Sequence, residues 1–93
     1  MQLRVTSEAV RIFVADWDFT PGDSVRIFVR YSGFSDAGPY SFGIMKDSPR
    51  HPAVTVQAEG ITFFMEQNDV WFLEDQELTL DGQHNEIVFV RGA

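Results

Sequence analysis

Residues 21–31 read Pro21-Gly22-Asp23-Ser24-Val25-Arg26-Ile27-Phe28-Val29-Arg30-Tyr31, a turn followed by an alternating segment. Proline and glycine at the start are typical of a turn. Val25, Ile27, Val29 and Tyr31 share one face of the predicted strand, because successive side chains of a strand point to opposite sides of a sheet. The segment therefore predicts a strand with one apolar face.

The segment before this turn predicts the one helix of several turns. Thr6-Ser7-Glu8 has the features of a helix start, since a hydroxyl caps free amides and a carboxylate lies near the positive end of the helix dipole. Val10, Phe13, Val14 and Trp17 follow at the i, i+3, i+4, i+7 spacing of one helix face. We expect a helix of about three turns with these four side chains buried.

The rest of the chain predicts short strands separated by turns. Glu59-Gly60 is expected to form a hairpin turn, Asp81-Gly82 another turn, and Asn68-Asp69 the start of a single helical turn over 70–73. The remaining strands are expected around 3–5, 40–44, 54–56, 61–66, 78–80 and 87–90. This pattern predicts a mainly β fold with one N-terminal α-helix, arranged as a small β-sandwich or partly open barrel.

Length and composition limit the classes of protein. A chain of 93 residues makes a single domain, 1–93, and 44% hydrophobic residues with nine Phe suffice for a core. The absence of cysteine excludes disulfides, thiolate metal sites and a nucleophilic thiol. No apolar segment is long enough to span a membrane, and the N-terminus lacks a secretory signal, so we expect a cytoplasmic protein.

The net charge of −7 is unevenly distributed along the chain. Residues 51–90 contain eight carboxylates and no Lys or Arg, whereas residues 1–50 are balanced. Binding to nucleic acid or to anionic membranes is not expected, because both depend on basic side chains. Solubility is the simplest explanation of the acidity.

Motifs for catalysis are absent, and one candidate metal site is weak. The sequence has no G-x-S-x-G elbow and no phosphate or dinucleotide loop, so we do not expect an enzyme. Asp81, His84 and Glu86 offer oxygen and nitrogen ligands to a divalent metal. However, residues of a short turn point in different directions, so an exposed turn is the simpler interpretation.

Aromatic side chains in predicted loops form the other candidate site. Phe34, beside Ser35, lies in the polar segment 32–39, and Trp71-Phe72 lies in an acidic one. Such rings can anchor a protein interface, or they can plug the open end of a small barrel. One ring can do both.

Several segments together resemble the HesB/IscA-type family of iron–sulfur cluster biosynthesis domains. They are Thr6-Ser7-Glu8-Ala9, the quoted turn and strand over 21–30, Gly60-Ile61-Thr62-Phe63-Phe64-Met65-Glu66, and Trp71-Phe72-Leu73 followed by Glu77-Leu78-Thr79-Leu80-Asp81. The resemblance implies a HesB-like fold from Leu3 to about Val90. Phe34 stands where the family has its first cluster-binding cysteine, and no cysteine occurs elsewhere. Because clusters are held by thiolates, the resemblance implies a cysteine-free branch without a cofactor.

We therefore expect a non-enzymatic accessory or binding domain that contacts a protein partner or small ligand as a monomer or homodimer. The candidate surface consists of Phe34, Ser35, Trp71 and Phe72. The alternative hypothesis is a metal-binding or iron-delivery protein that uses the oxygen and nitrogen ligands named above.

Overall fold

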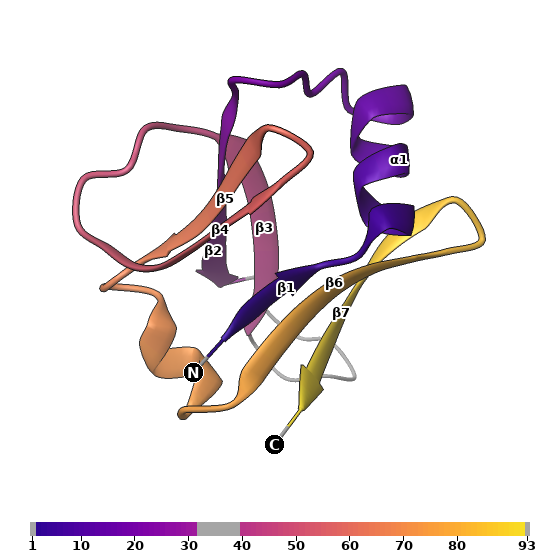
Figure 1. Cartoon of the computed structure of the whole chain (residues 1–93). Coiled ribbons are helices and arrows are strands. Elements are labelled where there is room, and N and C mark those ends of the chain that lie inside the picture. Colours follow the sequence, from indigo (N-terminus) through magenta and orange to yellow (C-terminus); the bar gives the residue numbers. More distant parts are fainter. Residues whose placement is uncertain (1, 32–39, 93) are drawn as a thin grey trace.

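The computed structural model describes residues 2–31 and 40–92 (Figure 1). These residues contain one α-helix, one 3-10 turn and seven strands. Their bounds are β1 Leu3–Val5, α1 Ser7–Asp16, β2 Ser24–Tyr31, β3 Tyr40–Lys46, β4 Pro52–Ala58, β5 Ile61–Glu66, η1 Val70–Leu73, β6 Glu77–Gln83 and β7 Glu86–Gly92. The predicted class, mainly β with one N-terminal helix, is confirmed.

The strands form two mixed sheets rather than a closed barrel. The smaller sheet has the order β1-β6-β7, with β1 parallel to β6 and β6 antiparallel to β7. The larger sheet has the order β3-β2-β5-β4, in which β2 and β5 run parallel and the outer strands run antiparallel. Figure 1 shows α1 beside the end of the smaller sheet where β6 turns into β7.

The hydrophobic core lies between the two sheets and the helix. Leu78 and Leu80 from the smaller sheet pack in one cluster with Ile27 and Phe63 from the larger sheet. Phe13 of α1 completes the cluster, with its ring centroid 5.4 Å from that of Phe63. Apolar residues from every layer are therefore removed from water together, which is the main driving force for a domain of this size.

The helix begins as the sequence predicts, but its buried face differs from the prediction. Thr6 is the N-cap, and its hydroxyl accepts a hydrogen bond of 3.1 Å from the Ala9 N–H. Val14 is 48% exposed and Trp17 is 41% exposed, so the prediction that they are buried was wrong. Ile12 takes their place in the core at 1% exposure.

The close contact between α1 and β6 explains both this difference and a second wrong prediction. Gly82 lies within β6 rather than in a turn, and the turn forms at His84-Asn85, where φ is 53° and 61°. A Cβ on Gly82 would lie 2.6 Å from Cδ1 of Ile12 and 2.8 Å from Cγ of Glu8. The glycine therefore lets the helix approach the strand and places Ile12 against it.

The predicted hairpin turn and single helical turn are both confirmed. Glu59 and Gly60 have φ values of 50° and 84° and connect β4 to β5. The single turn is the 3-10 segment Val70–Leu73, but the Asp69 side chain does not cap it. Its carboxylate binds Arg26 instead, as described below.

Candidate functional site

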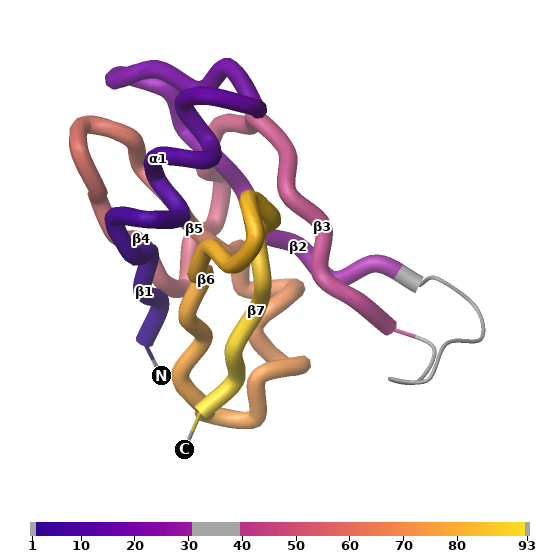
Figure 2. Tube along the Cα trace, turned by 90° about the vertical axis from the view of Figure 1, so that its right-hand side faces the viewer, coloured from indigo at the N-terminus to yellow at the C-terminus, as the bar shows by residue number. Residues whose placement is uncertain are grey.

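A groove lined by aromatic rings runs between β3 and β7, the edge strands of the two sheets. Among the described strands, β3 pairs with β2 alone and β7 with β6 alone. Figure 2 shows these two edges diverging toward the C-terminal end of β7. Two cavities of about 400 and 350 Å³ lie along them and share Phe42 and Phe89. We call this feature the aromatic groove; its large apolar lining residues are Trp17, Tyr40, Phe42, Ile44, Phe72, Ile87 and Phe89.

The rings of the groove contact one another across the two sheets. Phe42 of β3 stacks on Phe89 of β7, with ring centroids 5.1 Å apart. Phe72 of η1 packs edge-on against Phe42 at 5.4 Å. Trp71 packs edge-on against Tyr40 at 5.6 Å and is 56% exposed. Phe72 therefore fills one end of the groove, while Trp71 presents a large ring to solvent.

The predicted aromatic site is only partly within the described residues. Trp71 and Phe72 lie at the groove, and their ring centroids are 5.6 Å apart. Phe34 and Ser35 lie outside the described residues. Phe42 and Phe89 were missed as site residues, because on the sequence they are ordinary strand positions. Only the order of strands in the sheets brings them together.

Two arginines border the groove. The Arg91 guanidinium lies 4.7 Å from the ring centroid of Phe72, and its Nη2 donates a hydrogen bond of 2.6 Å to the Phe72 carbonyl oxygen. Arg30 is exposed and lines the larger cavity together with Trp17. Arginines beside aromatic faces are frequent at protein interfaces, since they offer both stacking and hydrogen bonds.

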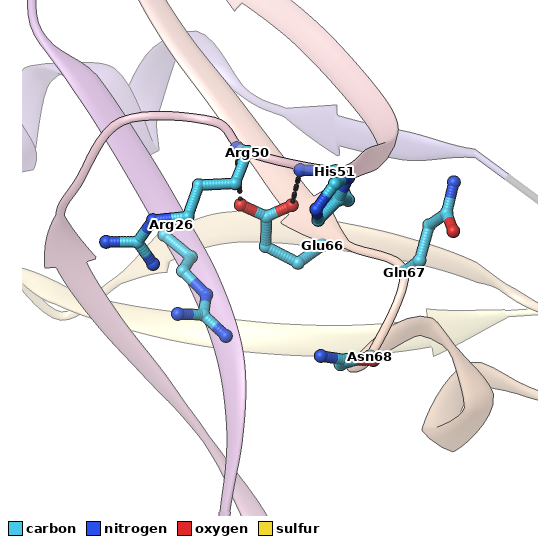
Figure 3. A pocket seen from close by; sticks show the side chains of 6 residues that line it. All are labelled: Arg26, Arg50, His51, Glu66, Gln67 and Asn68. Carbon is cyan, nitrogen blue, oxygen red and sulfur yellow. Dashed lines mark hydrogen bonds between the residues drawn. The ribbon is translucent and has the colours of Figure 1, made fainter.

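A second candidate site is a polar cavity of about 240 Å³ at the end of β5 (Figure 3). Glu66 is 6% exposed and accepts hydrogen bonds from the backbone N–H groups of Arg50 at 2.8 Å and His51 at 2.7 Å. Burial acts to raise the pKa of Glu66, but the two N–H donors and the nearby Arg26 outweigh it and lower the pKa below its ordinary value. Glu66 thereby fixes the loop before β4.

Arg26 holds the other side of this cavity. Its Nη2 donates a hydrogen bond of 2.8 Å to Oδ2 of Asp69. The other carboxylate oxygen of Asp69 accepts a hydrogen bond of 3.2 Å from the Val29 N–H. Oδ2 of Asp47 lies 3.6 Å from Nη1 of Arg26. The bond to Asp69 raises the pKa of Arg26, so the guanidinium stays charged. Its Nε is buried without a hydrogen-bond partner among the described residues. Arg26 and Arg50 pair here with Asp47 and Asp69, and these ion pairs join loops to strands.

The candidate metal ligands are not grouped as a metal site. The Asp81 carboxylate accepts hydrogen bonds from the Thr6 hydroxyl at 2.7 Å and from the Gly82 N–H at 2.8 Å. The bond from Thr6 and then that from Gly82 lower the pKa of Asp81. His84 lies in the left-handed turn, and Glu86 follows it in β7. Within residues 2–31 and 40–92, no three His, Asp or Glu side chains are placed to hold a metal ion.

The fold defines a small β-rich domain with two sheets and one helix, and its described residues expose three large aromatic side chains, Trp17, Tyr40 and Trp71. A relative in Bacillus subtilis (strain 168), named pyruvate dehydrogenase inhibitor, is 38% identical over 79 residues, which cover 84% of this chain and 83% of that protein. The chain belongs to the family of this inhibitor. No protein-family model matches the chain.

This relationship corrects the family and function expected from the sequence. The resemblance to HesB/IscA-type domains was wrong, since the relative is an inhibitor and no family model supports iron–sulfur assembly. The accessory role on an iron–sulfur scaffold and the alternative of iron delivery were wrong with it. The quoted motifs are strand and turn patterns, and the same patterns serve many β folds.

Other expectations agree with the relationship. The expectation that the chain is not an enzyme is confirmed, since its family is that of an inhibitor. A protein partner is likewise confirmed in general terms. The described part of the chain contains no helix long and apolar enough to cross a membrane. The monomer or homodimer state and the lack of nucleic-acid binding stay predictions.

Proposed function

We propose that this protein inhibits pyruvate dehydrogenase by binding to it directly. The single observation that carries the proposal is the 38% identity to a pyruvate dehydrogenase inhibitor over 84% of the chain. The relationship covers 84% of the chain, so the proposal concerns the domain and not a short motif within it. It also keeps the cytoplasmic location expected from the sequence, because an inhibitor must share a compartment with its target.

The structure supports binding rather than chemistry as the means of inhibition. The most exposed large apolar side chain of the described residues is Trp71, at 56%, and it continues a groove of clustered rings. Large aromatic residues dominate the binding energy of many protein interfaces. A rigid two-sheet scaffold presents these rings without a large loss of conformational entropy on binding.

A titration of the enzyme tests the proposal. Purified pyruvate dehydrogenase complex is assayed by pyruvate-dependent reduction of NAD⁺ while the protein is added in increasing amounts. We expect a saturable, reversible loss of activity, because binding without chemistry follows mass action. A 2-oxoglutarate dehydrogenase complex, which carries out parallel chemistry, serves as the specificity control.

The outcome that contradicts the proposal is equally direct. The proposal fails if the enzyme keeps full activity when this protein is added at about 100 times the Kd of a transient complex, and if the two proteins also sediment separately. Equal inhibition of both complexes would instead indicate a nonspecific effect of an acidic protein on the assay.

A further inference from the structure

The basic side chains of the protein divide into two groups. Of seven Lys and Arg residues, five form ion pairs with carboxylates. These pairs are Arg4–Glu77, Arg11–Glu8, Arg26–Asp69, Lys46–Asp23 and Arg50–Asp47. Arg30 and Arg91 have no carboxylate partner in the part of the chain that the structure describes, and both line the aromatic groove.

The position of these two charges is unusual for so acidic a protein. The net charge is −7, yet Glu86 is the one carboxylate among the described residues that line the two cavities of the groove. Two unneutralised guanidiniums therefore lie beside a cluster of rings. Charges that are left unpaired within a molecule are available for a partner, and complementary charge sets the choice and register of that partner.

The walls of the groove favour an extended partner segment. Within residues 2–31 and 40–92, β3 and β7 are both sheet edges, and a sheet edge offers backbone N–H and C=O groups to a further strand. Peptides bind such edges in extended form, and pockets along the edge take alternate side chains. The stacked rings of Phe42 and Phe89 form the apolar floor on which such a side chain packs.

We propose that the aromatic groove binds an extended, acidic segment of pyruvate dehydrogenase. An apolar side chain of the segment packs on Phe42 and Phe89, and carboxylates on either side of it pair with Arg30 and Arg91. This inference rests on the proposed function, because it names the site through which the enzyme is bound.

Arg30→Glu is the decisive variant. Arg30 is exposed and has no ion pair within the described residues, so its substitution leaves the fold intact. Replacing attraction by repulsion at the groove is expected to raise the half-inhibitory concentration about tenfold or more. Arg4→Glu is the matched control, since it makes the same charge change at an exposed position of β1, which is the opposite edge of the smaller sheet from β7. Its potency is expected to equal that of the wild type.

A second variant tests the aromatic part of the groove. Trp71→Ala removes an exposed ring that packs against Tyr40 at the end of the groove, and it is expected to raise the half-inhibitory concentration about tenfold or more, as for an aromatic anchor of a protein interface. A thermal melt of each variant verifies the fold. A photo-crosslinking residue placed at Trp71 captures the bound segment, and mass spectrometry identifies its sequence, which we expect to be acidic.

The results separate the two proposals. A wild-type protein that does not inhibit overturns the proposed function and this inference with it. A wild type that inhibits, with both variants as potent as the Arg4→Glu control, leaves the proposed function standing and overturns the groove as the site. A captured segment that is basic or without carboxylates overturns the acidic occupant.

Discussion

Glu66 shows how one buried carboxylate makes the stability of this protein depend on pH. Its pKa is lowered in the folded state, although burial alone would raise it, because two backbone N–H groups donate to the charged form. A carboxylate whose pKa is lowered by folding stabilises the protein at pH values above its ordinary pKa of 4.5. This stabilisation is lost as the pH falls through the folded-state pKa. The wild type should therefore become less stable below about pH 4.5.

The substitution Glu66→Gln tests this prediction. The amide keeps one acceptor oxygen but turns an NH₂ group toward a backbone N–H, so one hydrogen bond is lost and two donors face each other. We expect the Tm at pH 7 to fall by about 5 °C or more, and the difference from the wild type to shrink as the pH is lowered. Glu86→Gln, at an exposed position, is the control and should change neither quantity. A constant difference between pH 7 and pH 3 would contradict the assignment.

At the scale of elements, the contact between α1 and β6 depends on a missing side chain. Gly82→Ala would place a Cβ 2.6 Å from Cδ1 of Ile12, 2.8 Å from Cγ of Glu8 and 3.2 Å from the Glu8 backbone, so these side chains must shift and the helix must give way slightly. Overpacking of this kind costs about 1–3 kcal/mol in the free energy of unfolding, measured by urea titration. Gly92→Ala in β7 meets no atom within 4 Å and is the matched control, expected to be near neutral. Equal effects of the two substitutions would show that the close approach is not limiting.

The same contact shows which parts of the fold the sequence can predict. Alternation and the helical spacing are local, so the strands and the helix start at Thr6 were predicted correctly. Asp81-Gly82 has the composition of a turn, and nothing local distinguishes a glycine needed for a turn from one needed for close packing. The buried face of α1 depends on the same distant contact, which is why Val14 was expected in the core.

The candidate site follows the same rule. Trp71 could be singled out from sequence, because a large aromatic residue in an acidic segment is conspicuous there. Phe42 and Phe89 lie 47 positions apart and alternate like any strand residue, so their stacking follows only from the sheet order. Arg30 and Arg91, which form no ion pair among the described residues, could not be recognised either, since ion pairs depend on contacts such as Arg26–Asp69 between distant elements.

For the whole molecule, fold and function required different kinds of information. The apolar pattern was sufficient for the mainly β class, because it reflects which surfaces leave water. The same pattern misled when extended to a family, since a strand with a glycine turn carries no functional residue. Function lies in particular sites, and the class of partner that we propose comes from a relative 38% identical and not from the apolar pattern.

The net charge of the molecule yields the last prediction, which concerns salt. If Arg30 pairs with an acidic partner, inhibition should weaken as salt rises from 0.01 to 0.3 M, because the Debye length falls from about 30 Å to about 6 Å. Arg30→Gln and Arg4→Gln each change the net charge from −7 to −8, so long-range repulsion is the same in both. Arg30→Gln alone should flatten the plot of half-inhibitory concentration against salt, because it alone removes a charge from the groove. The measurement is the inhibition titration repeated at four salt concentrations, with activity normalised to the uninhibited enzyme at each. Parallel plots for the two variants would assign the salt effect to the molecule as a whole and not to the groove.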